Sequence, residues 1–307
     1  MENTSQHLTD AAEPAEKRRR ISSRAPLLQE TAFGSPRDFL DNRFVYVVVS
    51  SRARGLSVGL NLNPDKQCNF NCVYCEVRRD EPPREPSLKI EVLEAELKHT
   101  LAFIRDGRLR ERPWYHGVPD ELLQLRHVAL SGDGEPTFAP YFAEAVQAVV
   151  HVRALGGFPF FKMVLITNAT GLDQPQVQAG LRAFTHADEI WAKLDGGTQA
   201  YLNKVDGLKE PLEKILANIL RIARQRPVVI QSLFPALDGE EPPIEEIEQY
   251  AQRLKELKAD GAQIPLVQIY SATRPTPNSA CAHLSLKSLS RIAQTVRQVT
   301  GLKAEVF

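Results

Sequence analysis

Residues 61–75 read NLNPDKQCNFNCVYC, a loop that carries three thiols, Cys68, Cys72 and Cys75, directly after a run of β-forming residues. Cysteine thiolates are the usual ligands of iron–sulfur clusters, which normally take four of them. Three ligands on one short loop can hold three corners of a cubic cluster and leave the fourth iron open to an exchangeable ligand. The spacing therefore predicts a cluster with an open, catalytic iron.

Zinc is the competing interpretation of the same thiols. A structural zinc site takes four tetrahedral ligands and usually presents two close pairs of them. The fourth cysteine, Cys281, lies far along the chain within Ser279-Ala-Cys281-Ala-His283. A zinc site with Cys281 as one distant ligand therefore stays an alternative, although the simpler role of Cys281 is that of an ordinary thiol.

Composition narrows the class of protein. The 307 residues include 38 Lys and Arg and 38 Asp and Glu, so no global charge favours a nucleic acid or a membrane. Four cysteines, three of them clustered, are the wrong distribution for a disulfide framework and predict metal or redox chemistry in a reducing compartment. The first thirty residues are polar and charged, without the apolar run of a signal peptide, and no later apolar run is long enough to span a membrane. We therefore expect a soluble cytoplasmic protein.

The chain divides into a tail and a core. Residues 1–40 are polar, carry the basic run Lys17-Arg18-Arg19-Arg20 and show no apolar periodicity, so we expect a flexible, solvated tail. Residues 41–307 are expected to form one core domain, with a barrel at about 55–275 and a C-terminal helix at 284–300.

Within this core, β-rich runs alternate with amphipathic helical patterns, which is typical of βαβ units and a parallel sheet. Six such units are fewer than the eight of a full barrel, so the pattern favours an α/β fold, a partial (β/α)6 TIM-type barrel. A flavodoxin-like doubly wound sheet is the alternative, and both folds bind ligands at the carboxyl ends of the strands. The predicted strands are 58–62, 128–131, 164–167, 190–194, 228–233 and 266–270, with an extra strand at 44–49. The predicted helices are 90–104, 212–222, 244–257 and a last helix with Ser285 as N-cap.

Polar segments follow these strands, where a ligand site is expected. Gly132-Asp133-Gly134-Glu135-Pro136-Thr137 forms a glycine-rich bend after the second strand, and it exposes backbone groups and a carboxylate. The third strand ends in Thr167-Asn168 and the fourth in Lys193-Leu194-Asp195. Helix caps are the competing interpretation of these side chains.

The cysteine motif, with the aromatic Tyr74 directly before the last cysteine, resembles the signature of the radical S-adenosylmethionine (radical SAM) superfamily. The resemblance implies a partial (β/α)6 barrel, a 4Fe-4S cluster on Cys68, Cys72 and Cys75, and S-adenosylmethionine as cofactor. Gly134 and Glu135 match the family's Gly-Gly-Glu segment, which binds the methionine amino group, whereas Asp133 departs from it. The further cofactor-binding candidates are Asn168, Lys193 and Asp195, the backbone of Tyr74 beside the adenine, and, more weakly, Gln231 and Gln268.

Across residues 45–275 the chain resembles the radical SAM enzymes related to the tRNA wyosine (4-demethylwyosine) synthases. Those synthases use a second cluster with cysteines near the amino terminus, which are absent here. The resemblance implies reductive cleavage of S-adenosylmethionine to a 5′-deoxyadenosyl radical, an external flavodoxin- or ferredoxin-like electron donor, and hydrogen abstraction from an unidentified substrate, with a nucleoside or RNA among the candidates. Arg52, Arg54 and Arg274 are candidates for contacting an anionic substrate. The alternative is a non-catalytic metal-binding protein.

Overall fold

The computed structural model describes residues 39–274 and 276–307. The predicted tail, including the basic run at 17–20, lies outside these residues except for its last two positions. Those two positions belong to a 3-10 turn, Phe39–Asp41, in which the Phe39 ring is buried and packs edge-on against Phe103. Phe39 thus anchors the start of the described chain to the core.

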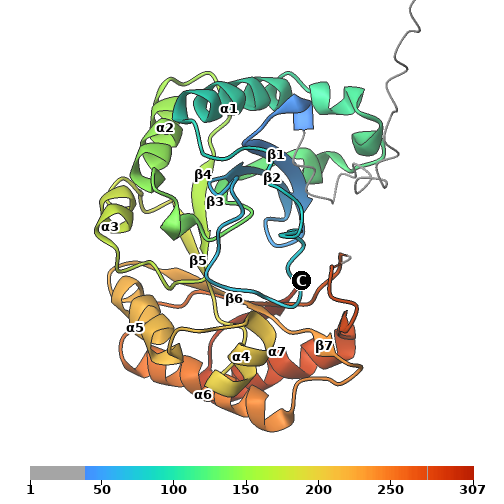
Figure 1. The fold of residues 1–307 in the computed structure, drawn as a ribbon, viewed down its shortest axis with the longest axis vertical. Coiled ribbons are helices and arrows are strands. Elements are labelled where there is room, and N and C mark those ends of the chain that lie inside the picture. The colour runs from blue at the N-terminus through green and yellow to red at the C-terminus, as the bar shows by residue number, and fades with distance from the viewer. Residues whose placement is uncertain (1–38, 275) are drawn as a thin grey trace, which may run out of the picture.

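The core is a curved sheet whose strands follow one another in chain order, β1-β2-β3-β4-β5-β6-β8-β10 (Figure 1). β1 runs antiparallel to β2, and every later neighbour in the sheet is parallel. A doubly wound sheet reverses its strand order at a switch point, and this order does not reverse. The predicted partial barrel is therefore confirmed, and the flavodoxin-like alternative is wrong. The strands are β1 Val45–Ser50, β2 Gly55–Asn61, β3 Leu125–Ser131, β4 Lys162–Thr167, β5 Glu189–Lys193, β6 Val228–Leu233, β8 Val267–Tyr270 and β10 Ala304–Val306, with β7 Ala236–Leu237 and β9 Cys281–Ala282 forming a separate antiparallel pair.

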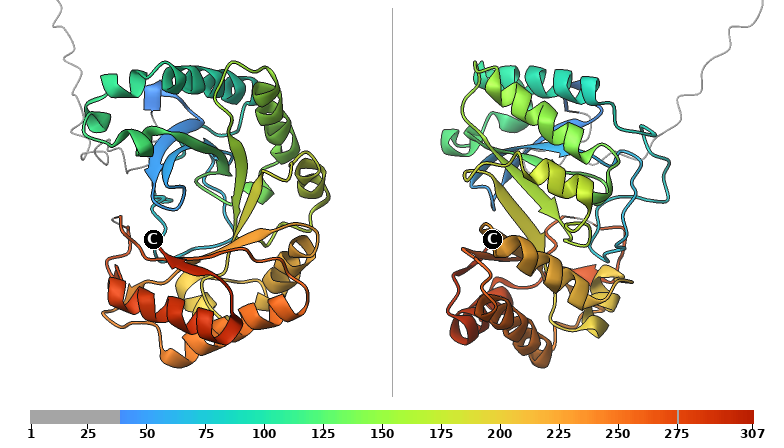
Figure 2. Two further views of the ribbon diagram at one scale, coloured as in Figure 1. Left: turned by 180° about the vertical axis from the view of Figure 1, so that it is seen from behind. Right: turned by 90° about the vertical axis from the view of Figure 1, so that its left-hand side faces the viewer.

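Helices cover the outer face of this curved sheet (Figures 1 and 2). In α1 the buried residues Leu93, Leu97 and Leu101 recur every four positions, which gives the helix one apolar face. In α7 the predicted cap is confirmed, because the Ser285 hydroxyl accepts from the Ser288 N–H at 3.1 Å. Along the described ranges, no helix is long and apolar enough to cross a membrane. The helices are α1 Ile90–Arg105, α2 Phe142–Ala154, α3 Pro175–Leu181, α4 Gln199–Asp206, α5 Leu212–Ala223, α6 Ile244–Ala259 and α7 Leu286–Thr300, with short 3-10 turns at Arg108–Glu111, Pro113–Tyr115, Asp120–Leu123 and Pro136–Phe138.

The two faces of the sheet have separate cores. Because side chains alternate along a strand, Leu165 and Ile190 pack under the helices in the main core, whereas Val164 and Trp191 belong to a small cluster on the inner face. Lys193 stands two residues after Trp191 and therefore shares the inner face, at the carboxyl end of β5. The fold thus aims this cation into the barrel.

Candidate active site

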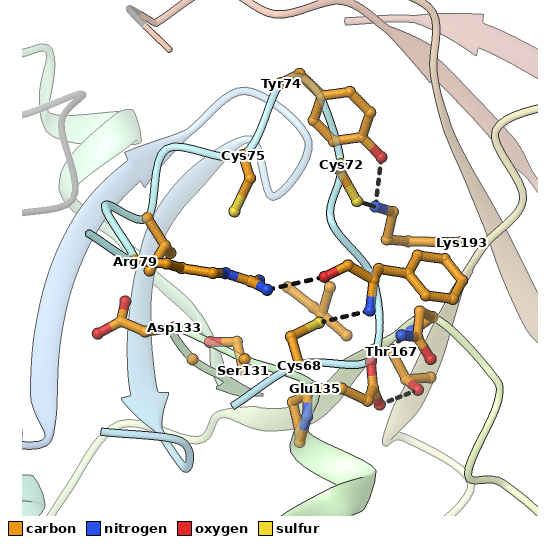
Figure 3. A pocket seen from close by; sticks show the side chains of 17 residues that line it. Cys68, Cys72, Tyr74, Cys75, Arg79, Ser131, Asp133, Glu135, Thr167 and Lys193 are labelled. Carbon is orange, nitrogen blue, oxygen red and sulfur yellow. Dashed lines mark hydrogen bonds between the residues drawn. The ribbon is translucent and has the colours of Figure 1, made fainter. Parts of the chain in front are cut away.

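The three motif cysteines line one cavity at the carboxyl ends of the strands, with a volume of about 190 Å³ (Figure 3). They are free thiols on the loop that follows β2. Among the sequence-predicted residues, Tyr74, Gly134, Glu135, Asn168 and Lys193 line the same cavity. The sheet therefore brings together residues up to 125 positions apart in sequence, since 193 minus 68 is 125. The remaining lining residues are Phe70, Val77, Arg79, Ser131, Gly132, Asp133, Pro136, Ile166 and Thr167.

Gly134 lets the bend after β3 lie directly against the cysteine loop. A Cβ atom at this position would stand 1.7 Å from the carbonyl oxygen of Gln67, the residue before Cys68. The neighbouring Glu135 N–H donates to the same oxygen at 3.2 Å. The glycine is thus required for contact between the two segments, which gives a packing reason for the motif beside its expected cofactor role.

The other side of the cysteine loop is held by the end of α4. The Asn71 N–H donates to the Asp206 carbonyl and the Val73 N–H to the Val205 carbonyl, both at 2.8 Å. The last carbonyls of a helix have no partner inside the helix, so here the loop supplies their donors. Cys72, which lies between these two donors in sequence, is positioned by α4 as well as by β2.

Glu135 ties β3 to β4 through its buried carboxylate. Oε1 accepts from the Thr167 hydroxyl at 2.5 Å and from the Thr137 hydroxyl at 2.6 Å, and Oε2 accepts from the Asn168 N–H at 2.7 Å. Burial raises the pKa of Glu135, and these donors only partly offset that effect. The Asn168 amide in turn donates to Asn69 Oδ1 at 2.8 Å. Glu135 and Asn168 therefore form a continuous chain of hydrogen bonds from the strand ends to Asn69 on the cysteine loop.

Lys193 joins Cys72 to a buried acidic pair. Its ammonium lies 3.6 Å from Cys72 Sγ and 3.3 Å from Asp195, and it donates to the Tyr74 hydroxyl. That hydroxyl contacts both Asp195 and Asp206. Burial lowers the pKa of Lys193, but the attraction of Asp195, Cys72 and Asp206 outweighs it and leaves the pKa well above its ordinary value. Lys193 is therefore a cation at neutral pH.

Burial also raises the pKa of Asp206, to about 7, and the charge of Asp195 adds to this effect. Asp195 itself does not line the cavity and receives the Leu233 N–H at 2.8 Å. Its carboxylate lies behind Tyr74 and Lys193 and holds them in place.

Several other sequence candidates lie away from the cavity. Gln231 and Gln268 are buried and hydrogen-bond each other at 2.9 Å, and Cys281 sits on β9. The three candidate arginines contact protein groups: the Arg52 guanidinium stacks 4.2 Å from the centre of the Tyr270 ring, Arg54 pairs with Glu305 at 2.7 Å, and Arg274 pairs with Glu76 at 2.9 Å.

Sequence reasoning missed Arg79, Asn69 and Asp206. Arg79 stands four residues after Cys75 on the same loop, and this short spacing could have identified it as a neighbour of the cysteines. Asn69 lies inside the motif, but its link to Asn168 depends on the sheet. Asp206 gives no sequence signal, because only the packing of α4 brings it to Tyr74.

The donor set suits an iron–sulfur cluster, because thiols from one loop border a cavity whose other walls carry backbone and polar groups. Over residues 39–274 and 276–307, no three His, Cys, Asp or Glu side chains form a group that could hold a single metal ion.

No protein-family model matches the chain, but comparison with known sequences gives several relatives. The chain is 28% identical over 244 residues to a UPF0026 protein of Helicobacter pylori, covering 76% of this chain and 67% of that one. It is 32% identical over 181 residues to a UPF0026 protein of Synechocystis, covering 57% of each. It is also 28% identical over 207 residues to the S-adenosyl-L-methionine-dependent tRNA 4-demethylwyosine synthase of Schizosaccharomyces pombe, covering 64% of this chain and 27% of that one. The chain thus spans about half to two thirds of the length of the UPF0026 proteins.

Solved structures support the fold. A structure of TYW1 with a lysine–pyruvate adduct matches with a TM-score of 0.52 at 17% identity, covering 84% of each chain. The Streptococcus suis protein SuiB bound to S-adenosylmethionine matches with a TM-score of 0.55 at 15% identity, covering 80% of this chain and 49% of that one. These comparisons confirm the resemblance predicted from the motifs: in sequence and in fold, the chain resembles the radical SAM proteins related to the wyosine synthases.

Proposed function

We propose that this chain is a radical SAM enzyme in which Cys68, Cys72 and Cys75 hold a 4Fe-4S cluster. One observation carries the proposal: the cavity bordered by these three thiols is also bordered by Gly134 and Glu135. A zinc site has no use for an adjoining glycine-rich bend in the wall of the same cavity, whereas a cofactor that must bind beside the cluster does.

When bound, a reduced cluster of this kind supplies the electron that splits S-adenosylmethionine into methionine and a 5′-deoxyadenosyl radical. The chain's own share is to bind and to exclude water. The bend at Gly134 and Glu135, with Asn168, is proposed to receive the methionine end of the cofactor, and the Tyr74 backbone the adenine. Lys193, paired with the Asp195 carboxylate behind it, supplies positive charge to the wall of the cavity. The apolar side chains of Phe70, Val77 and Ile166 complete the lining and limit the entry of water.

The proposal includes an external electron donor of the flavodoxin or ferredoxin type and a reducing, cytoplasmic location, which suits four free thiols. For the substrate, the name of the S. pombe relative supports a nucleoside within RNA. The hydrogen that is abstracted would then come from a group presented at the carboxyl edge of the barrel, where the cavity lies.

The test is anaerobic reconstitution with iron and sulfide, followed by reduction, addition of S-adenosylmethionine and chromatography of the products. We expect the wild-type protein to release 5′-deoxyadenosine and methionine. Cys72→Ala should bind less iron and release neither product, whereas the matched variant Cys281→Ala, outside the cavity, should retain both properties. A protein that binds zinc, takes up no iron and releases neither product would overturn the proposal.

A further inference from the structure

Two basic side chains line the cavity, Lys193 and Arg79. The cofactor of the proposed function carries a carboxylate on its methionine part, which a cation in the cavity wall can bind. The hydrogen-bond capacity of each side chain distinguishes them.

Protein groups surround the ammonium of Lys193. A lysine ammonium has three N–H donors; two of these are bound by Cys72 Sγ and the Tyr74 hydroxyl, and the Asp195 carboxylate forms an ion pair with the ammonium at 3.3 Å. A fourth group, the carboxylate of Asp206, lies 3.9 Å away. Lys193 is thus held by Asp195 and Asp206, and recruiting it for a ligand would break contacts that hold Tyr74 in place.

Arg79 has donors to spare. A guanidinium carries five N–H donors, and one of them is bound by the Phe70 carbonyl at 2.9 Å. The guanidinium also contacts the Cys68 and Cys75 thiols, which still leaves N–H donors for a ligand. In Figure 3 the guanidinium extends toward Cys68, below Cys75.

The carboxylates nearest to Arg79 in sequence pair with its neighbour. Arg78 binds Asp80 at 3.2 Å and Glu81 at 3.4 Å, on the exposed side of the loop. In the described part of the chain, Arg79 forms no ion pair with an Asp or Glu. Its charge is thus directed at the cavity and at the thiols.

We propose that Arg79 binds the carboxylate of S-adenosylmethionine and that Lys193 does not. The planar guanidinium matches a carboxylate with two parallel hydrogen bonds, which a lysine ammonium cannot supply. This inference rests on the proposed function, and it assigns the carboxylate end of the cofactor to one residue of the cysteine loop.

The experiment compares S-adenosylmethionine with its decarboxylated analogue, in which the carboxylate is missing. Both are titrated anaerobically against reconstituted but unreduced protein, so that binding is measured without turnover, and iron per chain is measured in parallel. Arg79→Gln should weaken binding of S-adenosylmethionine about tenfold or more and leave binding of the analogue within about twofold. The matched variant Arg78→Gln should change neither.

Three other outcomes would contradict the inference or the function beneath it. Equal weakening of both ligands by Arg79→Gln, or loss of iron, would mean that Arg79 supports the cysteine loop, and the inference would be wrong. Loss of the preference for the carboxylate in Lys193→Met, with Arg79→Gln unaffected, would also overturn it. Wild-type protein that takes up no iron would instead overturn the proposed function on which the inference rests.

Discussion

At the scale of single residues, His127 shows how the interior of the barrel changes the pKa of a titratable side chain. It lies on the inner face of β3, with Nε2 2.8 Å from the Ser57 hydroxyl and its ring edge-on to Trp191. Burial, helped by the positive charges of Lys162 and Arg52, lowers the pKa of His127 from 6.5 to about 3. The folded protein therefore keeps this imidazole neutral where the unfolded chain would protonate it.

That difference predicts that acid lowers the stability of the folded protein. Between pH 6.5 and about 3 the unfolded state binds more protons than the folded state, so the free energy of unfolding falls as the pH falls. The sensitivity is about 1.4 kcal/mol per pH unit at its steepest. His127→Gln should flatten the dependence measured by urea denaturation at pH 7, 6 and 5. The exposed control His186→Gln should leave the slope unchanged, and an equal slope in His127→Gln would contradict the assignment.

Residue types at fixed spacing were enough to pick out five residues that the structure brings together. The three cysteines and the pair Gly134 and Glu135 were found because their chemistry depends on local sequence, and the structure places all five around one cavity. The partners of Glu135 were not predicted. Thr167 reaches its carboxylate only because β3 and β4 are neighbours in the sheet, and sequence spacing carries no such information.

At the scale of elements, α4 and the cysteine loop meet at Gly207. This glycine follows α4 with φ +58°, a left-handed conformation, and a Cβ atom there would lie 3.1 Å from the Asn71 Cβ and 3.2 Å from the Asn71 carbonyl. Because Asn71 precedes Cys72, any shift of this contact is transmitted to a cysteine of the motif. Gly301 ends α7 with a similar φ of +65°, but its nearest neighbour is the flexible end of Lys258 at 3.5 Å.

Comparing Gly207 with Gly301 separates the effect of backbone strain from the effect of displacing the cysteine loop. Gly207→Ala and Gly301→Ala should each lower the free energy of unfolding by about 1–2 kcal/mol, because both place a Cβ in the left-handed region. Only Gly207→Ala should also lower the iron bound per chain after reconstitution. Equal iron contents in the two variants would show that contact with α4 does not position the cysteine loop.

Element prediction succeeded where the periodicity was long. All six parallel strands from β2 to β8 were predicted, as were α1, α5, α6 and α7, whose apolar stripes run for three turns or more. α3 and α4 were missed because seven or eight residues give too few turns to show a stripe. α2 was missed because alanine and valine occur around much of it, so that its buried face is weakly marked.

At the scale of the whole molecule, the sheet stays open between its two edge strands, β1 and β10. An ion pair connects the first hairpin to the last strand. Arg54, in the β1–β2 turn, pairs with Glu305 on β10. The register of β10 on β8 begins at Ala304 opposite Val267. Chain order and strand number predicted the partial barrel, but they did not predict β10, because three residues after a helix are too few to show a strand period.

The last strand should contribute more to stability than its ion pair does. Ala304 is buried, its carbonyl accepts two hydrogen bonds from the Arg297 guanidinium, and the Phe307 N–H donates to the Ile269 carbonyl. Ending the chain after Lys303 removes these contacts and exposes the backbone edge of β8, which can then pair with other molecules. We expect a lower urea midpoint and a shift toward aggregates in size-exclusion chromatography.

Glu305→Ala is the matched control, because it removes the ion pairs to Arg54 and Lys303 and leaves β10 in place. Both cationic side chains are largely exposed, so their loss should cost at most about 1 kcal/mol. A truncated protein as stable and as monomeric as Glu305→Ala would mean that β8 tolerates an open edge. The expected difference between the two variants instead measures what the backbone pairing of β10 contributes, because the truncation alone leaves the N–H and C=O groups of β8 without a strand partner on that side.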